Sequence, residues 1–254
     1  MKIAVCVKHA VDETELKLDP SGKPLLAGAA GKMSTFDKNA VEEGLRLKAK
    51  LLGDVTVFMV GTPDSKKTLK EALAMGADRG VLVTSAPGTL DTFRTAEVLA
   101  GAIKKSGPYD IVICAEGSSD TYSGQVPPML GEFLGVPYVG YARKIDVSGQ
   151  SARIERSLEE SVETVESPIP LALSVVSEIN EPRYPTLIQI MQASKKPIEE
   201  LMADAAAPPG DYKQLAVSSM SSQPSSRKHV LIQGTPEEAA AKLVEALVKE
   251  GVLK

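Results

Sequence analysis

The stretch IVICAEGSSDTYSGQVPPMLGEFLG, residues 111–135, decides the fold because it joins a strand, a polar loop and a helix. Its first four residues, 111–114, form an apolar run typical of a buried strand. Residues 117–124 are all small or polar apart from Tyr122, and an amphipathic segment follows them. A strand, a polar turn and a helix form an anion or nucleotide site in many proteins, but they also form ordinary connections without a ligand. The stretch by itself leaves both interpretations open.

The segments before this stretch repeat the alternation of apolar strands and amphipathic helices. This alternation requires a parallel sheet that is covered on both faces, so the fold class is α/β with a mostly parallel, doubly wound, Rossmann-like sheet. Ligands of such sheets lie beyond the carboxyl ends of the strands, which selects the loops after Val7, Val60 and Cys114. The predicted strands are 2–7, 55–60 and 81–83, the predicted helices run from Phe36 to Gly53, Thr62 to Gly76 and Thr89 to Lys105, and a hairpin is predicted over 16–26.

From Val139 onward the pattern changes to strands with few helices between them. Strands predicted over 141–147, 152–156, 162–166 and 171–176 indicate an antiparallel extension of the same sheet. Residues 204–228 are rich in Ala, Pro, Ser, Gly and Gln and predict an extended arm. The sequence TPEE at 235–238 then begins an apolar-faced helix, which needs a docking surface on this chain or on a partner. We expect an α/β domain over residues 1–200 and an arm with a C-terminal helix over residues 201–254.

Composition narrows the class of protein. The chain has 254 residues, of which 43% are hydrophobic, enough for one sizeable core. A net charge of −4 argues against non-specific nucleic-acid binding. Cys6 and Cys114 each end an apolar run without metal-ligand spacing, so we expect buried, reduced thiols. The chain begins with MKIAVCVKH and has no apolar run of transmembrane length, so we expect a cytoplasmic, prokaryotic protein without direct membrane insertion.

Four stretches carry a pattern that no general secondary-structure requirement explains. They are VCVKHAVDE at 5–13, AVEEGLRLKAK at 40–50, KEALAMGADRGVLV at 70–83 and, most specific, INEPRYPTLIQIMQASKK at 179–196. In this order they resemble the β subunit of electron transfer flavoproteins. The resemblance implies an adenine-nucleotide alpha-hydrolase-like fold and a heterodimer with an α subunit that holds most of the redox FAD. It also implies AMP in this subunit or, in electron-bifurcating relatives, a second FAD.

The same resemblance implies an electron carrier that catalyses no reaction by itself. Such a heterodimer accepts electrons from flavin dehydrogenases of the acyl-CoA type and passes them to a quinone oxidoreductase or another acceptor. A bifurcating form would add NADH-dependent oxidoreductase activity. Two rivals from other classes are a homodimeric nucleotide-sensing module of the universal-stress-protein type and an NAD-dependent oxidoreductase. The sequence has no G-x-G-x-x-G after the first strand to support the second rival.

The resemblance assigns the nucleotide site to four segments, three of which follow the strands selected above. From their chemistry we expect backbone N–H groups of residues 123–126 to face phosphate and Asp120 to cap the loop or bind a ribose hydroxyl. We expect Cys6 and Phe36 to line the adenine. The assigned residues are Cys6, Val7, Lys8, Ser34, Thr35, Phe36, Asp37, Val60, Gly61, Asp120, Thr121, Tyr122, Ser123, Gly124, Gln125 and Val126.

The identity of the nucleotide is open at this point. The end of the loop, Gln125-Val126-x-Pro128, follows the bifurcating pattern, whereas Tyr122 and Ser123 do not. Tyr122 either closes the pocket around AMP or shares it with a second flavin, and we expect AMP. Glu13 stands where relatives have an aromatic residue near the flavin of the α subunit. The family's acidic-Gly-Gly turn is replaced by residues 157–161, so the flavin potentials and the partners are not fixed by the resemblance.

Residues 181–196, here called the recognition segment, are expected to bind a partner. The resemblance places Leu187 where the family inserts a side chain into a hydrophobic pocket of a dehydrogenase, with Tyr184, Ile188 and Met191 around it. The alternatives are a helix that packs on the chain's own core, or a helix with one face buried and Leu187 exposed. Glu181 and Arg183 are expected to form a structural pair. The C-terminal helix is expected to dock on the α subunit.

Overall fold

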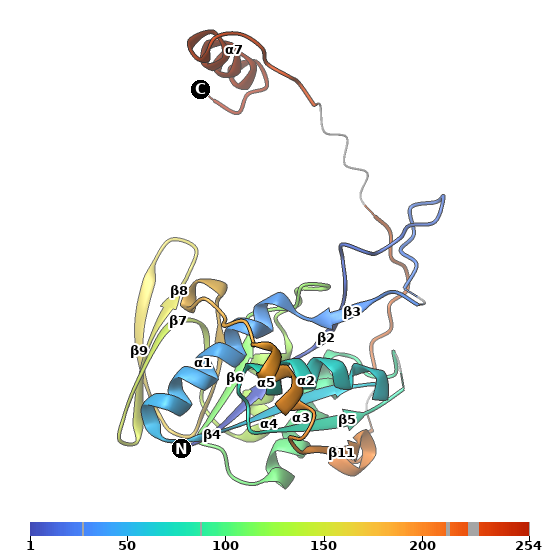
Figure 1. Ribbon diagram of the computed structural model, residues 1–254, viewed down its shortest axis with the longest axis vertical. Helices are drawn as coiled ribbons and strands as arrows, with labels where there is room; N and C mark the ends of the chain where they lie inside the picture. The colour runs from blue at the N-terminus through green and yellow to red at the C-terminus, as the bar shows by residue number, and fades with distance from the viewer. Residues whose placement is uncertain (27, 87, 212–213, 223–228, 254) are drawn as a thin grey trace.

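A sheet of nine strands forms the centre of the computed structural model, which describes residues 1–26, 28–86, 88–211, 214–222 and 229–253 (Figure 1). Within these residues the strand order is β11-β5-β4-β1-β6-β10-β7-β8-β9. Neighbours from β11 to β7 are parallel, whereas β8 and β9 pair antiparallel at one edge. The strands are β1 (Lys2–Cys6), β4 (Asp54–Gly61), β5 (Arg79–Thr84), β6 (Ile111–Ala115), β7 (Tyr138–Ser148), β8 (Ser151–Ser157), β9 (Val162–Pro168), β10 (Leu171–Val175) and β11 (Ile198–Met202).

Helices cover both faces of the sheet, as the predicted fold class requires. Side chains of β1 alternate between the two faces, so Ile3 and Val5 enter one buried cluster while Ala4 and Cys6 enter the other. Burial on both faces explains why the central strands are continuous apolar runs. The first face carries α1 (Thr35–Leu51), α2 (Lys66–Met75) and α5 (Leu187–Ala193), and the second carries α3 (Thr92–Ser106), α4 (Val126–Leu134) and α6 (Ala203–Ala206). Two short 3-10 turns, η1 (Pro63–Ser65) and η2 (Ser177–Ile179), precede α2 and follow β10.

The strand predicted over 171–176 is not part of the antiparallel extension. Its counterpart β10 lies between β6 and β7 and is parallel to both. Every residue of β10 is buried, which marks a central strand, whereas an edge extension alternates buried and exposed residues. The extension therefore consists of β7, β8 and β9 alone.

The hairpin predicted over 16–26 is also wrong in extent. Only an isolated bridge between Leu18 and Pro24 forms there, because the Asp19 carboxylate accepts hydrogen bonds from the backbone N–H groups of Ser21 and Lys23 and holds a local turn. The regular antiparallel pair is β2 (His9–Val11) with β3 (Gly31–Met33). Similarly, α1 ends at Leu51 because Leu52, rather than Gly53, takes the left-handed conformation with φ of 50°.

The sheet body continues past residue 200. Strand β11 spans the expected domain boundary, pairs with β5, and leads into α6, whose Ala203 and Ala206 pack against α3. The buried Arg94 guanidinium donates a hydrogen bond to the carbonyl oxygen of Pro208 at 3.1 Å and another to that of Ala207, which holds the start of the arm against α3.

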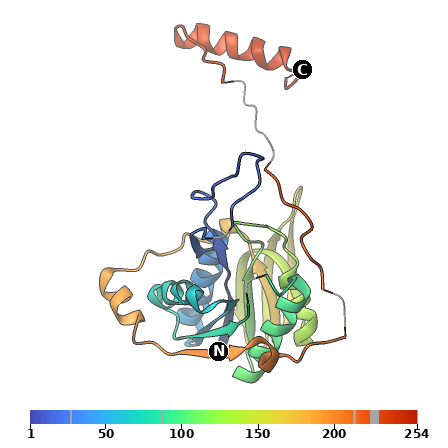
Figure 2. The same cartoon turned by 90° about the vertical axis from the view of Figure 1, so that its right-hand side faces the viewer.

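The C-terminal helix α7 (Pro236–Lys249) forms where the sequence predicts it. Thr235 and Glu238 make a reciprocal capping box, with Pro236 at the first helical position. None of the residues of α7 is buried, and the helix lies apart from the sheet body in two perpendicular views (Figures 1 and 2). No helix within the described residues is long and apolar enough to cross a membrane.

Candidate functional site

A cavity of about 870 Å³, here called the β1–β6 cavity, lies beyond the carboxyl ends of β1, β4 and β6. The chain leaves β1 toward α1 on one face and leaves β6 toward α4 on the other, so a crevice forms where the two connections diverge. Its volume falls within the range of roughly 300–1,000 Å³ that ligand pockets occupy. The fold therefore builds a pocket at the place where the strand-end rule selects one.

Most of the residues assigned from the sequence lie on the wall of this cavity. The wall includes Cys6, Val7, Lys8, Asp37, Val60, Gly61, Thr121, Ser123, Gly124, Gln125 and Val126. The other assigned residues are not among those that line the cavity: Ser34, Thr35, Phe36, Asp120 and Tyr122. Ser34 supports the wall because its hydroxyl accepts a hydrogen bond from the backbone N–H of Ser119 at 3.2 Å.

Lys8 connects the end of β1 to the loop after β6. Its ammonium group lies 2.7 Å from Asp120 Oδ1 and 3.3 Å from the hydroxyl oxygens of both Ser118 and Thr121. Burial opposes ionisation of Asp120, but the hydrogen bonds from Lys8 and Ser118 outweigh it and lower the pKa of this carboxyl. Among the described wall residues, Lys8 is the only Lys or Arg, so it supplies the positive charge of the cavity.

Asp37 is a buried acid in the first turn of α1. Its Oδ2 accepts a hydrogen bond from the backbone N–H of Lys8 at 2.7 Å. Burial raises the pKa of Asp37 to about 8, and the negative charge of Asp120 adds to the rise, although Lys8 acts in the opposite direction. Burial therefore favours the protonated form of this carboxyl at the cavity wall.

The aromatic residues of the site face each other rather than the cavity. Tyr122 has a left-handed backbone with φ of 45°, and its ring lies 5.3 Å from that of Phe36. The ring also covers Gly117, where an added Cβ would lie 2.6 Å from it. Neither residue is among those that line the cavity, because the two rings pack against one another. That Phe36 lines the adenine, and that Tyr122 closes the pocket or shares it with a flavin, stay predictions.

The loop before α4 has backbone N–H groups that the first turn of the helix lacks. The helix begins at Val126, and Pro127 and Pro128 have no N–H group to offer. Gly124 takes φ of 63° immediately before the helix. The Gln125 side chain is occupied, because its Oε1 accepts a hydrogen bond from the Thr92 hydroxyl at 3.0 Å. Residues 123–126 all line the cavity, and that their backbone N–H groups face a phosphate stays a prediction.

The far side of the cavity was missed by the sequence interpretation. It is built by the residue after β4, the loop between β5 and α3, α3 itself and a piece of the arm: Thr62, Ser85, Ala86, Gly88, Leu90, Asp91, Thr92, Thr95, Leu99, Leu215, Ala216 and Val217. The backbone N–H of Leu215 donates to Asp91 Oδ2 at 2.9 Å, which fixes the arm there. The strand-end rule applied to residues 81–83 would have found Ser85. Nothing in the composition of the arm indicates its position.

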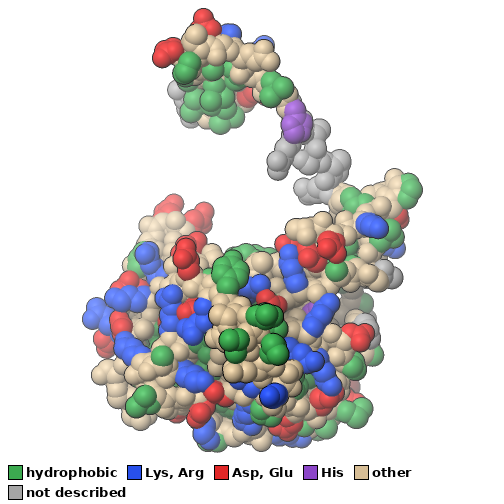
Figure 3. Space-filling view, viewed as in Figure 1, with side chains coloured by type: hydrophobic (Ala, Val, Ile, Leu, Met, Phe, Trp, Pro, Cys, Tyr) green, Lys and Arg blue, Asp and Glu red, His purple; other side chains and the backbone are tan. Residues whose placement is uncertain are grey.

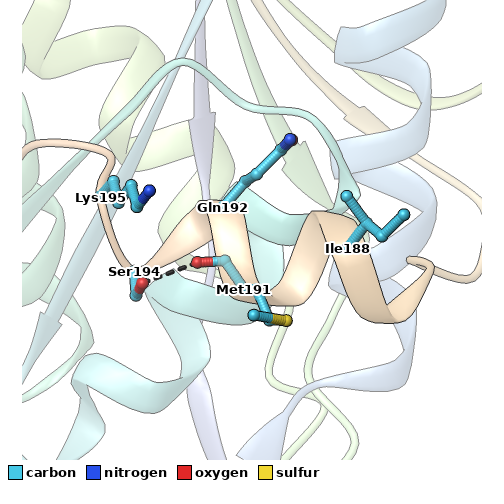
Figure 4. A pocket seen from close by; sticks show the side chains of 5 residues that line it. All are labelled: Ile188, Met191, Gln192, Ser194 and Lys195. Atoms are coloured by element: carbon cyan, nitrogen blue, oxygen red, sulfur yellow. Dashed lines mark hydrogen bonds between the residues drawn. The ribbon is translucent and has the colours of Figure 1, made fainter.

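The recognition segment presents its apolar side chains to solvent. Tyr184, Leu187, Ile188 and Met191 are all exposed, with Leu187 at 74%, whereas Ala193 is buried against the first core cluster. Figure 3 shows hydrophobic side chains gathered on the surface over α5, with Lys and Arg side chains around them. Ile188, Met191, Gln192, Ser194 and Lys195 line a hollow there (Figure 4). Of the alternatives, the structure shows the one with a small buried face and Leu187 exposed.

Arg183 pairs with Glu42 of α1 and not with Glu181 as expected. Its Nε lies 2.7 Å from Glu42 Oε2, and its Nη2 lies 3.1 Å from Glu42 Oε1. The fold brings these residues together although they are 141 positions apart in the sequence. No local pattern in the sequence could indicate this pair.

Comparisons with known proteins agree with this structure. The model of the electron transfer flavoprotein domain matches residues 25–206. The chain is similar to the electron transfer flavoprotein subunit beta of Thermoanaerobacterium thermosaccharolyticum, with 36% identity and both chains fully covered. It is 37% identical to that of Clostridium acetobutylicum, with 98% of this chain and 99% of the relative covered. A third relative, the caffeyl-CoA reductase-Etf complex subunit CarD of Acetobacterium woodii, is 35% identical over 78% of this chain and 77% of its own.

The match to the family model covers most of the sheet body. The alignments to the first two relatives extend across the arm and the C-terminal helix as well. Together with the sheet order and the β1–β6 cavity, they identify this chain as a member of the electron transfer flavoprotein beta-subunit family.

Proposed function

We propose that the β1–β6 cavity binds an adenine nucleotide and that AMP is its occupant. The observation that carries this proposal is the meeting of the Lys8 ammonium with the Gly-containing loop of residues 123–126 on one wall. A cation and free backbone N–H groups favour phosphate. Apolar wall residues such as Val7, Val60 and Leu99 favour the flat base.

The absence of a side chain at Gly124 fits such a ligand. Gly124 approaches the carbonyl oxygen of Glu116 so closely that an added Cβ would lie 3.2 Å from it. With glycine at this position, the loop keeps its conformation beside the cavity.

We also propose that the chain acts as the β subunit of a heterodimer that carries electrons between proteins. FAD, held mainly by the α subunit, would supply the redox chemistry, and this chain would supply the nucleotide site, the docking segment and the subunit contacts. Flavin dehydrogenases of the acyl-CoA type are the proposed donors, and a quinone oxidoreductase is the proposed acceptor. An exposed apolar cluster around Leu187 is the kind of anchor that fills a pocket on a donor.

The C-terminal helix is the proposed contact with the α subunit. Its residues Leu243, Val244 and Val248 are exposed on α7, and no residue of this helix is buried in the chain itself. An amphipathic helix with an uncovered apolar face gains stability by packing on a partner.

The experiment that tests these proposals is purification of the heterodimer followed by acid release of its ligands. One FAD and one AMP per heterodimer are expected. A colourless homodimer with a nucleotide would contradict the proposal and favour the nucleotide-sensing module. In the same heterodimer, Leu187→Ala is expected to weaken electron transfer from an acyl-CoA dehydrogenase while nucleotide and FAD contents stay constant, and unchanged kinetics would exclude the docking role.

A second candidate is the bifurcating form, in which the cavity holds a second FAD. It is favoured by the similarity to the subunit of a caffeyl-CoA reductase-Etf complex and by Gln125-Val126-x-Pro128. It is also favoured by the position of the Tyr122 ring outside the cavity wall. Two FAD per heterodimer together with NADH-dependent activity would select this form over the AMP form.

A further inference from the structure

Polar contacts hold the recognition segment on both sides of α5. The preceding residues bind side chains of α1, and the following Lys196 binds the carboxyl end of α2. Between these anchors α5 has only seven residues and one buried side chain, Ala193. A helix this short is marginal by itself, so its orientation depends on what fixes its ends.

The first anchor is built around the buried carboxylate of Glu42. Arg183 donates to it three times, through Nε, Nη2 and its backbone N–H at 2.7, 3.1 and 3.2 Å. Arg46 adds a hydrogen bond from Nε at 3.0 Å. Burial opposes ionisation of Glu42, but these donors outweigh it and lower the pKa of this carboxyl. A two-point contact between guanidinium and carboxylate fixes direction as well as distance.

The same face of α1 holds the residues just before Arg183. Asn39 Nδ2 donates to the carbonyl oxygens of Ser177 and Asn180 at 2.9 and 2.8 Å. Asn180 Nδ2 donates in return to the carbonyl oxygen of Asn39 and to Glu43 Oε2, each at 3.1 Å. Positions 42 and 43 lie three and four residues after position 39, so the three side chains lie on one face of α1. This face binds the residues that lead into α5.

The second anchor is the ammonium group of Lys196. It donates to the carbonyl oxygens of Leu73 and Ala77 at 2.9 and 2.7 Å. These carbonyls lie at the end of α2, where free acceptors and the helix dipole favour a cation. Burial lowers the pKa of Lys196, which agrees with its position under the segment rather than in open solvent.

We propose that Glu42 and Lys196 are positioning residues for partner docking, because they set the direction in which α5 presents Leu187. This inference rests on the proposed docking function. A segment that is already ordered loses less conformational entropy when it binds, so the anchors contribute to affinity without contacting the partner. Glu42 is nearly fully buried. Burial of a carboxylate costs free energy of folding unless ion pairs and hydrogen bonds compensate for it, and here Arg183 and Arg46 provide them.

The test uses the full heterodimer with an acyl-CoA dehydrogenase and its substrate, at varied heterodimer concentration. Glu42→Gln removes the charge that Arg183 and Arg46 bind. Arg183→Gln breaks the same pair from its half-exposed side, so it provides a folded variant if Glu42→Gln is unstable. Asp146→Asn is the matched control, because it removes a carboxylate that pairs with Lys50 at the other end of α1. FAD and nucleotide contents, thermal stability and flavin reduction by dithionite, which needs no docking, are measured alongside.

We expect both Arg183→Gln and Glu42→Gln to raise the KM for the heterodimer by roughly tenfold, since Arg183→Gln removes both guanidinium hydrogen bonds to Glu42 and Glu42→Gln removes the charge that strengthens them. We expect kcat, FAD content and dithionite reduction to stay near those of the parent and of Asp146→Asn. If Leu187→Ala raises the KM while Arg183→Gln does not, docking stands and the positioning role is excluded. If Leu187→Ala has no effect, the docking function fails and this inference fails with it. A parallel loss of FAD and of thermal stability in Arg183→Gln would show a purely structural role and overturn the inference.

Discussion

The ammonium group of Lys8 at the end of β1 lies 2.7 Å from the carboxylate of Asp120 in the loop after β6. The two residues are 112 positions apart, and their strands are parallel neighbours in the sheet. This contact ties the end of one strand to the polar loop of the next across the crevice. Lys8 is also a wall residue, so its ammonium group lies beside the space that a ligand would occupy.

Lys8→Gln is expected to lower nucleotide affinity by at least tenfold, because the cavity loses its positive charge. Nucleotide released by acid from the purified heterodimer, and rebinding of AMP measured by calorimetry, report this change. Lys50→Gln is the matched control, because it removes an ammonium that pairs with Asp146 on the protein surface. Equal affinities for the two variants would show that Lys8 does not contact the ligand.

Gly124→Ala is expected to lower nucleotide content, because the added methyl group would lie 3.2 Å from the carbonyl oxygen of Glu116 and displace the loop. Gly135→Ala is the control, since Gly135 also has a positive φ, 72°, but no atom lies within 4 Å of an added Cβ. Both variants are expected to lose about 1 kcal/mol of unfolding free energy from backbone strain. Only Gly124→Ala is expected to lose nucleotide, and equal nucleotide contents would contradict its role.

Asp37→Asn is expected to change how stability depends on pH. The folded-state pKa of Asp37 is about 8, well above that of an unfolded chain. Its protonated form therefore contributes stability that is fully present below about pH 4 and is lost progressively as pH rises toward 8. The Asn variant keeps an acceptor for the Lys8 N–H and lacks this loss.

Urea unfolding of the ligand-free parent and of Asp37→Asn at pH 5 and pH 8 checks this prediction. The free energy of unfolding of Asp37→Asn, relative to that of the parent, is expected to be larger at pH 8 than at pH 5. A constant difference would mean that Asp37 is ionised throughout this range.

Leu243→Asp is expected to weaken association with the α subunit, because it places a charge on the exposed apolar face of α7. Lys242→Asp places the same carboxylate on the polar face and serves as control. Analytical ultracentrifugation of the mixed subunits measures the dissociation constant. A loss of association confined to Leu243→Asp is the expected outcome, and identical constants for both variants would remove α7 from the interface.

Helix and strand positions followed from the sequence wherever one pattern was sufficient. The apolar runs of β1, β4 and β6 and the capping sequence at Thr235 lie where expected, because solvent exclusion and capping act locally. The strand at 171–176 was recognised, but its neighbours were not. Its pairing with β6 and β7 depends on how the chain connects the strands, and the local hydrophobic pattern carries no information on this connectivity.

The candidate site also has parts that the sequence predicts and parts that only the structure shows. The loops after β1, β4 and β6 could be selected in advance, because parallel strands bring their carboxyl ends to one edge of a sheet. The sequence by itself determined the α/β class, the family and these loops, since each depends on periodicity or on a contiguous motif. The tertiary structure alone decided that Tyr122 packs on Phe36, that the arm at Leu215 lines the cavity and that Arg183 binds Glu42. These contacts join residues that are far apart in the sequence, or depend on whether a side chain faces the cavity or a neighbouring ring. Only the packing of the whole chain decides between such alternatives.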